Sequence, residues 1–223
     1  MFAGHVGAAM AIARAERRVN VGVFIGAALV LDMLLWLFIL LGWESVAIPA
    51  DVSSTRLPVF VFPYSHGLLA AAIWSAAAGV LAYVAYSRIA EARRRIAALV
   101  AAATFSHWLL DALVHRPEMP LVGAASAKVG LGLWQSLPVA LVLEAAVVVL
   151  GMGLFLPGSG LSRGKSFALA LLALVVLAFT VLGMTMAPPP PSAFAMAASS
   201  LATLIGVCAL AVWLGRRPRA GQV

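Results

Sequence analysis

The chain has 223 residues, of which 64% are hydrophobic and only 10% are charged, and its formal net charge is +7. Soluble domains carry roughly 25% charged residues, so this composition excludes an ordinary soluble protein and indicates a multi-pass membrane protein. The positive charge then reflects arginines in short cytoplasmic loops, and no nucleic acid partner is expected. The apolar stretches lack the alternation of β-strands, so we predict an all-α bundle.

In chain order, the apolar stretches predict a short N-terminal half-helix over residues 1–13, followed by six transmembrane helices. The half-helix would reach only ~20 Å, too short to cross a bilayer core of ~30 Å, so it is expected as a half-helix or an interfacial helix. The six predicted spans cover residues 20–42, 65–88, 95–115, 136–157, 166–187 and 193–214. We therefore predict a polytopic membrane helix bundle that forms one domain, residues 1–223.

Basic residues assign the two sides of the membrane. Arg and Lys gather at residues 14–18, 88–95, 163–165 and 216–219, whereas the intervening loops carry a nearly balanced mixture of charges. The positive-inside rule therefore predicts a cytoplasmic C-terminus and outer loops at 43–64 and 116–135. No cleavable signal peptide is apparent, because the first charges follow the first apolar stretch. The single cysteine, Cys208, excludes an intrachain disulfide.

Ionisable side chains inside the spans are the candidates for function, because a charge at that depth is costly unless it binds a proton, a metal ion or another charge. Counting ~1.5 Å per helical residue from the basic loops places three acids and two histidines in one middle-to-outer layer, with two more histidines above it. The resulting candidate metal ligands are His5, Asp32, His66, His107, Asp111, His115 and Glu144.

One helix contributes a row of these groups. His107, Asp111 and His115 recur every fourth residue, so a helix places them on one face, where a His-x-x-x-Asp pair can chelate one ion. Imidazole and carboxylate ligands suit zinc first, with manganese or iron as alternatives. A proton or ion pathway is the competing interpretation. It predicts polar residues through the whole membrane thickness, and the cytoplasmic halves of the spans have none.

Several of these residues lie in short motifs. The motifs are Gly4-His5, Asp32, Tyr64-Ser65-His66-Gly67-Leu68, Ser106-His107-Trp108-Leu109-Leu110-Asp111 and His115-Arg116-Pro117. Over roughly residues 1–145 their order resembles the YdjM-type family of bacterial inner-membrane metal-dependent hydrolases. That family looks distantly similar to zinc-dependent phospholipase C and the fungal single-strand nucleases. We also expect Ser65 to cap the span that His66 opens.

The resemblance implies an inner-membrane hydrolase with a divalent metal, acting on a phosphoester or lipid-type substrate from the periplasmic side. It implies catalytic roles for Asp32, His66 and Glu144, with Asp32 as the candidate general base. The chain departs from the distant enzymes at Ala140, where they have a histidine. It also lacks the second acid of their Asp-x-Asp-His stretch, since Met33 and Leu34 follow Asp32. The resemblance therefore does not extend to the complete set of ligands with which those enzymes hold three metal ions.

The alternative is a non-catalytic accessory subunit of a larger membrane complex, with the polar cluster a structural or vestigial metal site. Residues 1–157 would then form the metal-site helices, and residues 158–223 a two-helix scaffold or partner-binding hairpin. The two predicted spans within residues 166–214 carry no charged side chain. They are expected to contact membrane lipids and possible protein partners.

Overall fold

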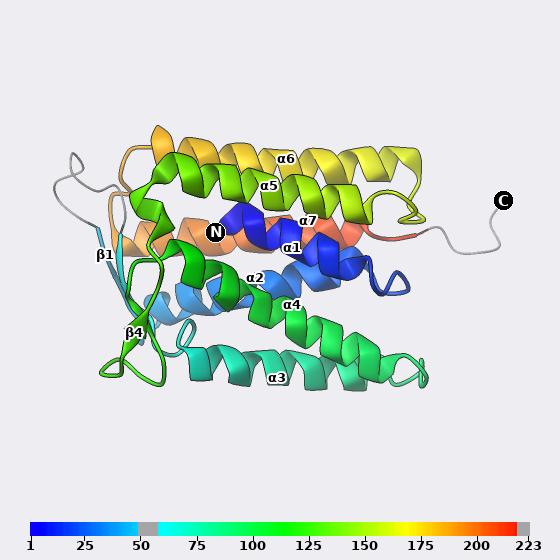
Figure 1. The fold of residues 1–223 in the computed structure, drawn as a ribbon, viewed down its shortest axis with the longest axis horizontal. Helices are drawn as coiled ribbons and strands as arrows, with labels where there is room; N and C mark the ends of the chain where they lie inside the picture. The colour runs from blue at the N-terminus through cyan, green and yellow to red at the C-terminus, as the bar shows by residue number, and fades with distance from the viewer. Residues whose placement is uncertain (49–57, 218–223) are drawn as a thin grey trace.

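The computed structural model describes residues 1–48 and 58–217, and this part of the chain is an all-α bundle (Figure 1). Part of the predicted outer loop, residues 49–57, and the basic residue Arg219 lie outside it. Six helices are long and apolar enough to cross a membrane: α2 (Val21–Leu40), α3 (Leu68–Ala85), α4 (Arg93–Val114), α5 (Leu137–Phe155), α6 (Arg163–Thr185) and α7 (Ala193–Leu214). Each predicted span is confirmed to within about a turn of a helix, which indicates a multi-pass membrane protein.

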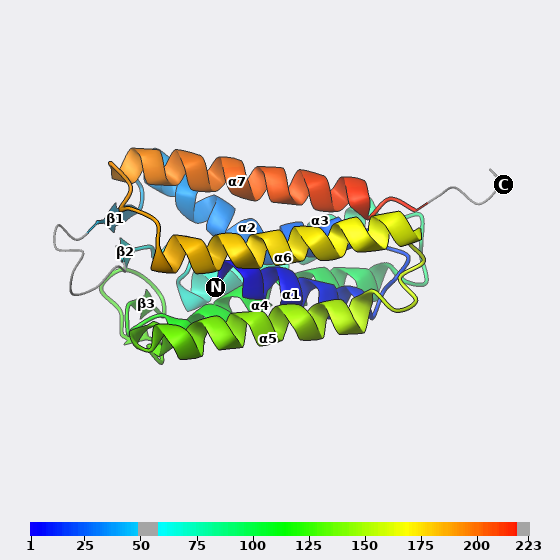
Figure 2. The ribbon, with the colours of Figure 1, turned by 90° about the horizontal axis from the view of Figure 1, so that it is seen from above.

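The first helix, α1 (Phe2–Ala13), lies inside the bundle, and its N-terminal end stops between the two ends of the long helices (Figures 1 and 2). It packs against α2, α4, α5 and α6. Most of its side chains are buried, including His5 and Met10. The half-helix prediction is thus confirmed, and the burial disfavours the interfacial alternative. The first turn of α1 therefore lies at the depth of the predicted polar layer.

Glycines allow α1 to approach α5 closely. A Cβ atom on Gly7 would lie 2.5 Å from the carbonyl oxygen of Val147, and a Cβ atom on Gly151 would overlap the backbone of Gly7. Small residues at such crossings let helix backbones come into direct contact, which is a common way to pack helices in membranes. The position of α1, and of the side chains it carries, therefore depends on this pair of glycines.

Two short antiparallel hairpins lie at one end of the bundle, which we call the hairpin end (residues 41–48, 58–67 and 115–136; Figure 1). Strand β1 (Ser45–Ala47) pairs with β2 (Val59–Val61), and β3 (Met119–Pro120) pairs with β4 (Lys128–Val129), followed by the 3-10 turn η1 (Leu133–Gln135). The predicted outer loops thus contain strands that hydropathy did not indicate. Strand β1 contacts α2 and α7, and η1 contacts α4 and α5.

Candidate metal centre

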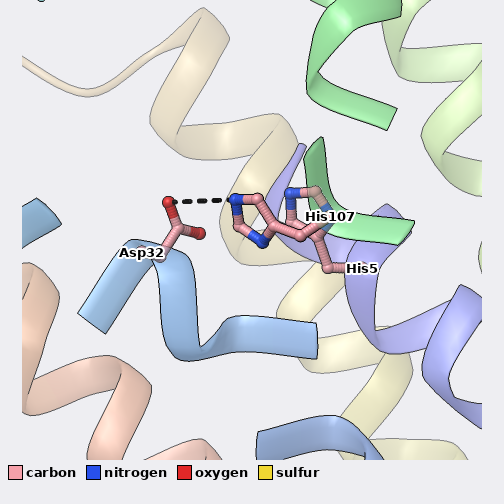
Figure 3. A group of neighbouring side chains, drawn as sticks. All are labelled: His5, Asp32 and His107. Carbon is pink, nitrogen blue, oxygen red and sulfur yellow. Dashed lines mark ion pairs between the residues drawn. The ribbon is translucent and has the colours of Figure 1, made fainter. Parts of the chain in front are cut away.

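Three helices and one turn bring five of the seven predicted ligands together. His5 comes from α1, Asp32 from α2, and the pair His107 and Asp111 from one face of α4. His66 lies in the turn that precedes α3. Figure 3 shows the Asp32 carboxylate facing the ring of His107, with His5 alongside. Ligand atoms of two overlapping groups lie within 4.8 Å of one another: His5, Asp32 and His107 form one group, and His66, His107 and Asp111 form the other.

The second group forms a nearly equilateral triangle of ligand atoms. The Nε2 atoms of His66 and His107 are 3.1 Å apart. The Oδ2 atom of Asp111 lies 3.4 Å from the first and 3.2 Å from the second. Ligands bound to zinc at ~2.0–2.1 Å in a tetrahedron are separated by ~3.3 Å. The three atoms therefore match one face of a tetrahedral site.

The hydrogen-bond partners fix which ring nitrogens carry hydrogen. The Nδ1 atom of His107 lies 2.6 Å from the carbonyl oxygen of Ala28, which can only accept. The Nδ1 atom of His66 lies 2.8 Å from the hydroxyl of Ser65, whose own hydrogen is donated to Glu44. Both rings therefore donate through Nδ1, and in their neutral forms both present an Nε2 lone pair to the triangle.

This convergence leaves a set of acceptors without a donor. Two Nε2 lone pairs and a carboxylate oxygen meet in a buried space, and they repel one another unless a proton or a metal ion lies between them. The Nδ1 atom of His5 has no hydrogen-bond partner among the described residues, and its Nε2 atom, 3.1 Å from Oδ1 of Asp111, makes no hydrogen bond of ordinary geometry. An unpartnered buried polar atom costs about 1–3 kcal/mol. Both observations fit the binding of a cation.

Asp111 is the most heavily engaged acid of the cluster. Its Oδ1 atom accepts a hydrogen bond of 2.9 Å from the amino group of Met1 and lies 3.1 Å from the Nε2 atom of His5. The ring of His5 stacks on that of His107 with 3.7 Å between the ring centroids. Sequence reasoning missed Met1, because its amino group reaches Asp111 only when α1 is buried in the bundle.

Asp32 is the side chain through which the cluster reaches the surface. It is 19% exposed, whereas the side chains of His5, His66, His107 and Asp111 are each 3% exposed or less. Its Oδ1 atom lies 3.6 Å from the Nε2 atom of His66 and 3.7 Å from that of His107. A molecule approaching the triangle from outside would therefore meet Asp32.

The other two predicted ligands border the cluster without joining either group. Glu144 accepts a hydrogen bond of 3.1 Å from the backbone amide of Gly4, so it holds the first turn of α1 against α5. His115 is the C-cap of α4: its backbone amide still donates to the carbonyl oxygen of Asp111, and the backbone becomes extended only beyond it. Its Nε2 atom is 3.7 Å from the Oδ2 atom of Asp111, and its Nδ1 atom is 2.7 Å from Glu118. Ligand roles for both remain predictions.

The turn before α3 also differs from the expectation. The N-cap of α3 is Gly67, with no side-chain hydrogen bond, so Ser65 does not cap this helix. Its hydroxyl instead links His66 to Glu44. Glu44 was expected only as a loop charge, yet its side chain is buried within the hairpin end. The only sequence signal was an acidic residue directly after a predicted span.

Two acids at the hairpin end have shifted pKa values. Burial raises the pKa of Glu44 above its ordinary value, partly opposed by hydrogen bonds from Ser65. Burial would also raise the pKa of Glu118, but hydrogen bonds from His115 and Arg116 outweigh it and lower that pKa. Hydrogen bonds thus favour the charged form of Glu118, whereas at Glu44 burial outweighs them.

Comparison with known proteins adds no assignment to this geometry. The chain matches no family model, no curated protein sequence and no solved structure. The structure itself shows a buried group of histidines and aspartates that could hold a metal ion, inside a bundle with six helices long and apolar enough to cross a membrane.

Proposed function

We propose that this protein is a membrane-embedded, metal-dependent hydrolase of the YdjM type that acts on a phosphoester of lipid type. The observation that carries the proposal is the triangle of His66 Nε2, His107 Nε2 and Asp111 Oδ2, with both imidazoles oriented as ligands. Catalytic zinc sites have three protein ligands and one open position. A metal ion bound there, zinc in the first instance, would lower the pKa of a water molecule and so supply a nucleophile.

The chain's own residues would divide the remaining work. His66, His107 and Asp111 hold the ion, and His5 lies against His107 as a further ligand. Asp32, on the exposed side, is placed to orient a water molecule and to accept its proton. The catalytic role of Glu144 stays a prediction, because in this structure its carboxylate accepts a hydrogen bond from the backbone of α1.

A lipid-type substrate is supported by the surroundings of the turn that carries His66. An apolar groove of about 650 Å³ lies at the hairpin end, and its lining residues include Phe38, Trp43, Tyr64, Ile73 and Trp74. Tyr64, which lines the groove, lies two residues before His66, and none of the five cluster residues lines the groove itself. With the arginine-rich end in the cytoplasm, as the positive-inside rule predicts, the groove would open toward the periplasmic leaflet.

The test is metal content followed by turnover. The protein is purified in detergent without a metal-affinity tag, and bound metal is measured by mass spectrometry for wild type, Asp111→Asn and a control, Glu16→Gln. We expect stoichiometric metal in wild type and the control, and loss of metal in Asp111→Asn. Wild-type protein that holds no stoichiometric metal would refute the proposal.

Turnover is then measured on a soluble phosphodiester and on phospholipid vesicles. Loss of a general base costs typically 10²–10⁴-fold in rate, so Asp32→Asn should retain metal yet lose most activity. The accessory-subunit alternative is favoured by one observation: among the described residues, α6 and α7 contribute no member of the cluster. Stoichiometric metal without turnover of either substrate would favour that alternative.

A further inference from the structure

A buried carboxylate that is outside the metal cluster connects to it through one hydroxyl. Glu44 lies between the end of α2 and strand β1 and is 5% exposed. Its Oε1 atom accepts hydrogen bonds from the backbone amides of Tyr64 at 2.8 Å and Ser65 at 2.9 Å. Its Oε2 atom accepts the hydroxyl hydrogen of Ser65 at 2.7 Å. All three donors come from the turn that leads into His66.

The order of these hydrogen bonds determines the state of His66. A serine hydroxyl has one hydrogen to donate, and here the Glu44 Oε2 atom accepts it. The Ser65 oxygen can then only accept from its other neighbour, the Nδ1 atom of His66 at 2.8 Å. His66 must therefore carry a hydrogen on Nδ1, which leaves Nε2 directed at His107 and Asp111.

We propose that Glu44 is a positioning residue that, through Ser65, keeps a hydrogen on His66 Nδ1 and holds its Nε2 atom in the ligand orientation. Outer-shell acceptors of this kind fix the tautomer and the ring orientation of metal-binding histidines. The use of Nε2 as a ligand rests on the proposed function. The position of the hydrogen does not, because it follows from the hydrogen bonds alone.

The Glu44→Gln variant tests this with little change of shape. Its amide oxygen can still accept the two backbone amides, but its NH₂ group would face Ser65 and donate to it. The Ser65 hydroxyl is then free to donate to His66 Nδ1, and the ring hydrogen moves to Nε2, toward the carboxylates of Asp32 and Asp111. This single substitution should thus move the ring hydrogen of His66 from Nδ1 to Nε2, where it blocks the ligand atom.

The first measurement is the protonation of the ring itself. The chain has four histidines, so ¹⁵N-histidine labelling in lipid bilayers gives few signals, and a His66→Gln sample identifies those of His66. In metal-free wild type we expect Nδ1 of His66 to be protonated. In Glu44→Gln and in Ser65→Ala we expect the proton to leave Nδ1. An Nδ1 that stays protonated in both variants overturns the proposal.

Ser65→Ala separates this role from simple unfolding, because in this variant Glu44 still accepts the two backbone amides of the turn. If Glu44 only stabilised the turn, this variant would leave the His66 ring unchanged. Glu16→Gln is the matched control: the same chemical change at a buried carboxylate, placed before α2 and paired with Arg18. It should leave the His66 signals as they are in wild type.

The second measurement is affinity for Co²⁺, followed by its visible absorption. Loss of an outer-shell partner typically weakens metal affinity 10- to 100-fold, and we expect this for Glu44→Gln and Ser65→Ala but not for Glu16→Gln. If wild type binds no Co²⁺, the proposed function fails, and the ring measurement still decides the role of Glu44. Unchanged affinity in both variants, with Co²⁺ bound by wild type, overturns the positioning role.

Discussion

Replacing Gly7 or Gly151 with alanine should displace α1 from α5. A Cβ atom on Gly7 would lie 2.5 Å from the Val147 carbonyl oxygen, whereas ordinary contact begins at 3.4 Å. The obstacle is backbone, so no side-chain rotation relieves it, and the helices must separate by about 1 Å in a tightly packed region. Overpacking of this kind typically costs 1–3 kcal/mol.

A second effect opposes this one and is smaller. Alanine is favoured over glycine in helices by about 1 kcal/mol, so the net loss at Gly7 or Gly151 should be up to about 2 kcal/mol. Gly153, which lies on α5 with Gly151, has nothing within 4 Å of the point where an added Cβ atom would lie. Gly153→Ala is therefore the matched control and should be neutral or stabilising. The two kinds of variant should shift stability in opposite directions.

The assay is thermal unfolding in detergent combined with metal content. We expect Gly7→Ala and Gly151→Ala to melt below wild type, and Gly153→Ala at or above it. Separation of α1 from α5 would also stretch the 3.1 Å bond between Glu144 and Gly4 and move His5, so metal content should fall in the first two variants. Equal melting temperatures for Gly7→Ala and Gly153→Ala would refute the close backbone contact.

Three further predictions follow from other contacts. The hydrogen bond from Arg18 lowers the pKa of Glu16. The stability that this pair contributes is therefore present above pH 4.5, the ordinary pKa of the group, and is lost as the pH falls below that value. Glu16→Gln should melt below wild type at pH 7, and the difference between the two melting temperatures should close on acidification. Chelation of metal should lower the melting temperature of wild type and leave Asp111→Asn unchanged, whereas equal shifts would show that the chelator acts elsewhere. Asn20 caps α2 and donates a hydrogen bond to the Val212 carbonyl of α7. Asn20→Ala should therefore lower the free energy of unfolding by about 1 kcal/mol or more. A melting curve identical to that of wild type would contradict this.

The spans and the depth of the polar layer could be predicted from the sequence, because apolar length and arginine anchors act locally along the chain. Counting residues from the basic loops placed Asp32, His107 and Asp111 in one layer, and the structure brings these three into the same cluster. The spacing of His107 and Asp111 sufficed because α4 is regular at that point. These predictions needed only helix geometry.

The remainder depended on contacts between distant segments. Nothing in the spacing shows that α4 ends at Val114, or that the Nδ1 atom of His115 lies 2.7 Å from Glu118. The link from Glu44 to Ser65 joins residues 21 positions apart through a hairpin that hydropathy did not indicate. The acceptor of His107 is a backbone carbonyl of α2, and a carbonyl leaves no mark in a sequence.

His107 belongs to both groups of candidate ligands, and this limits how many ions the cluster can hold. Its Nδ1 hydrogen is committed to the Ala28 carbonyl, so the ring has a single lone pair to offer. One lone pair coordinates one ion. The two groups could therefore hold the same ion at alternative positions, one formed with His5 and Asp32 and the other with His66 and Asp111. Movement of an ion between these two positions would change the other coordinating residues, while the ring of His107 stays in place.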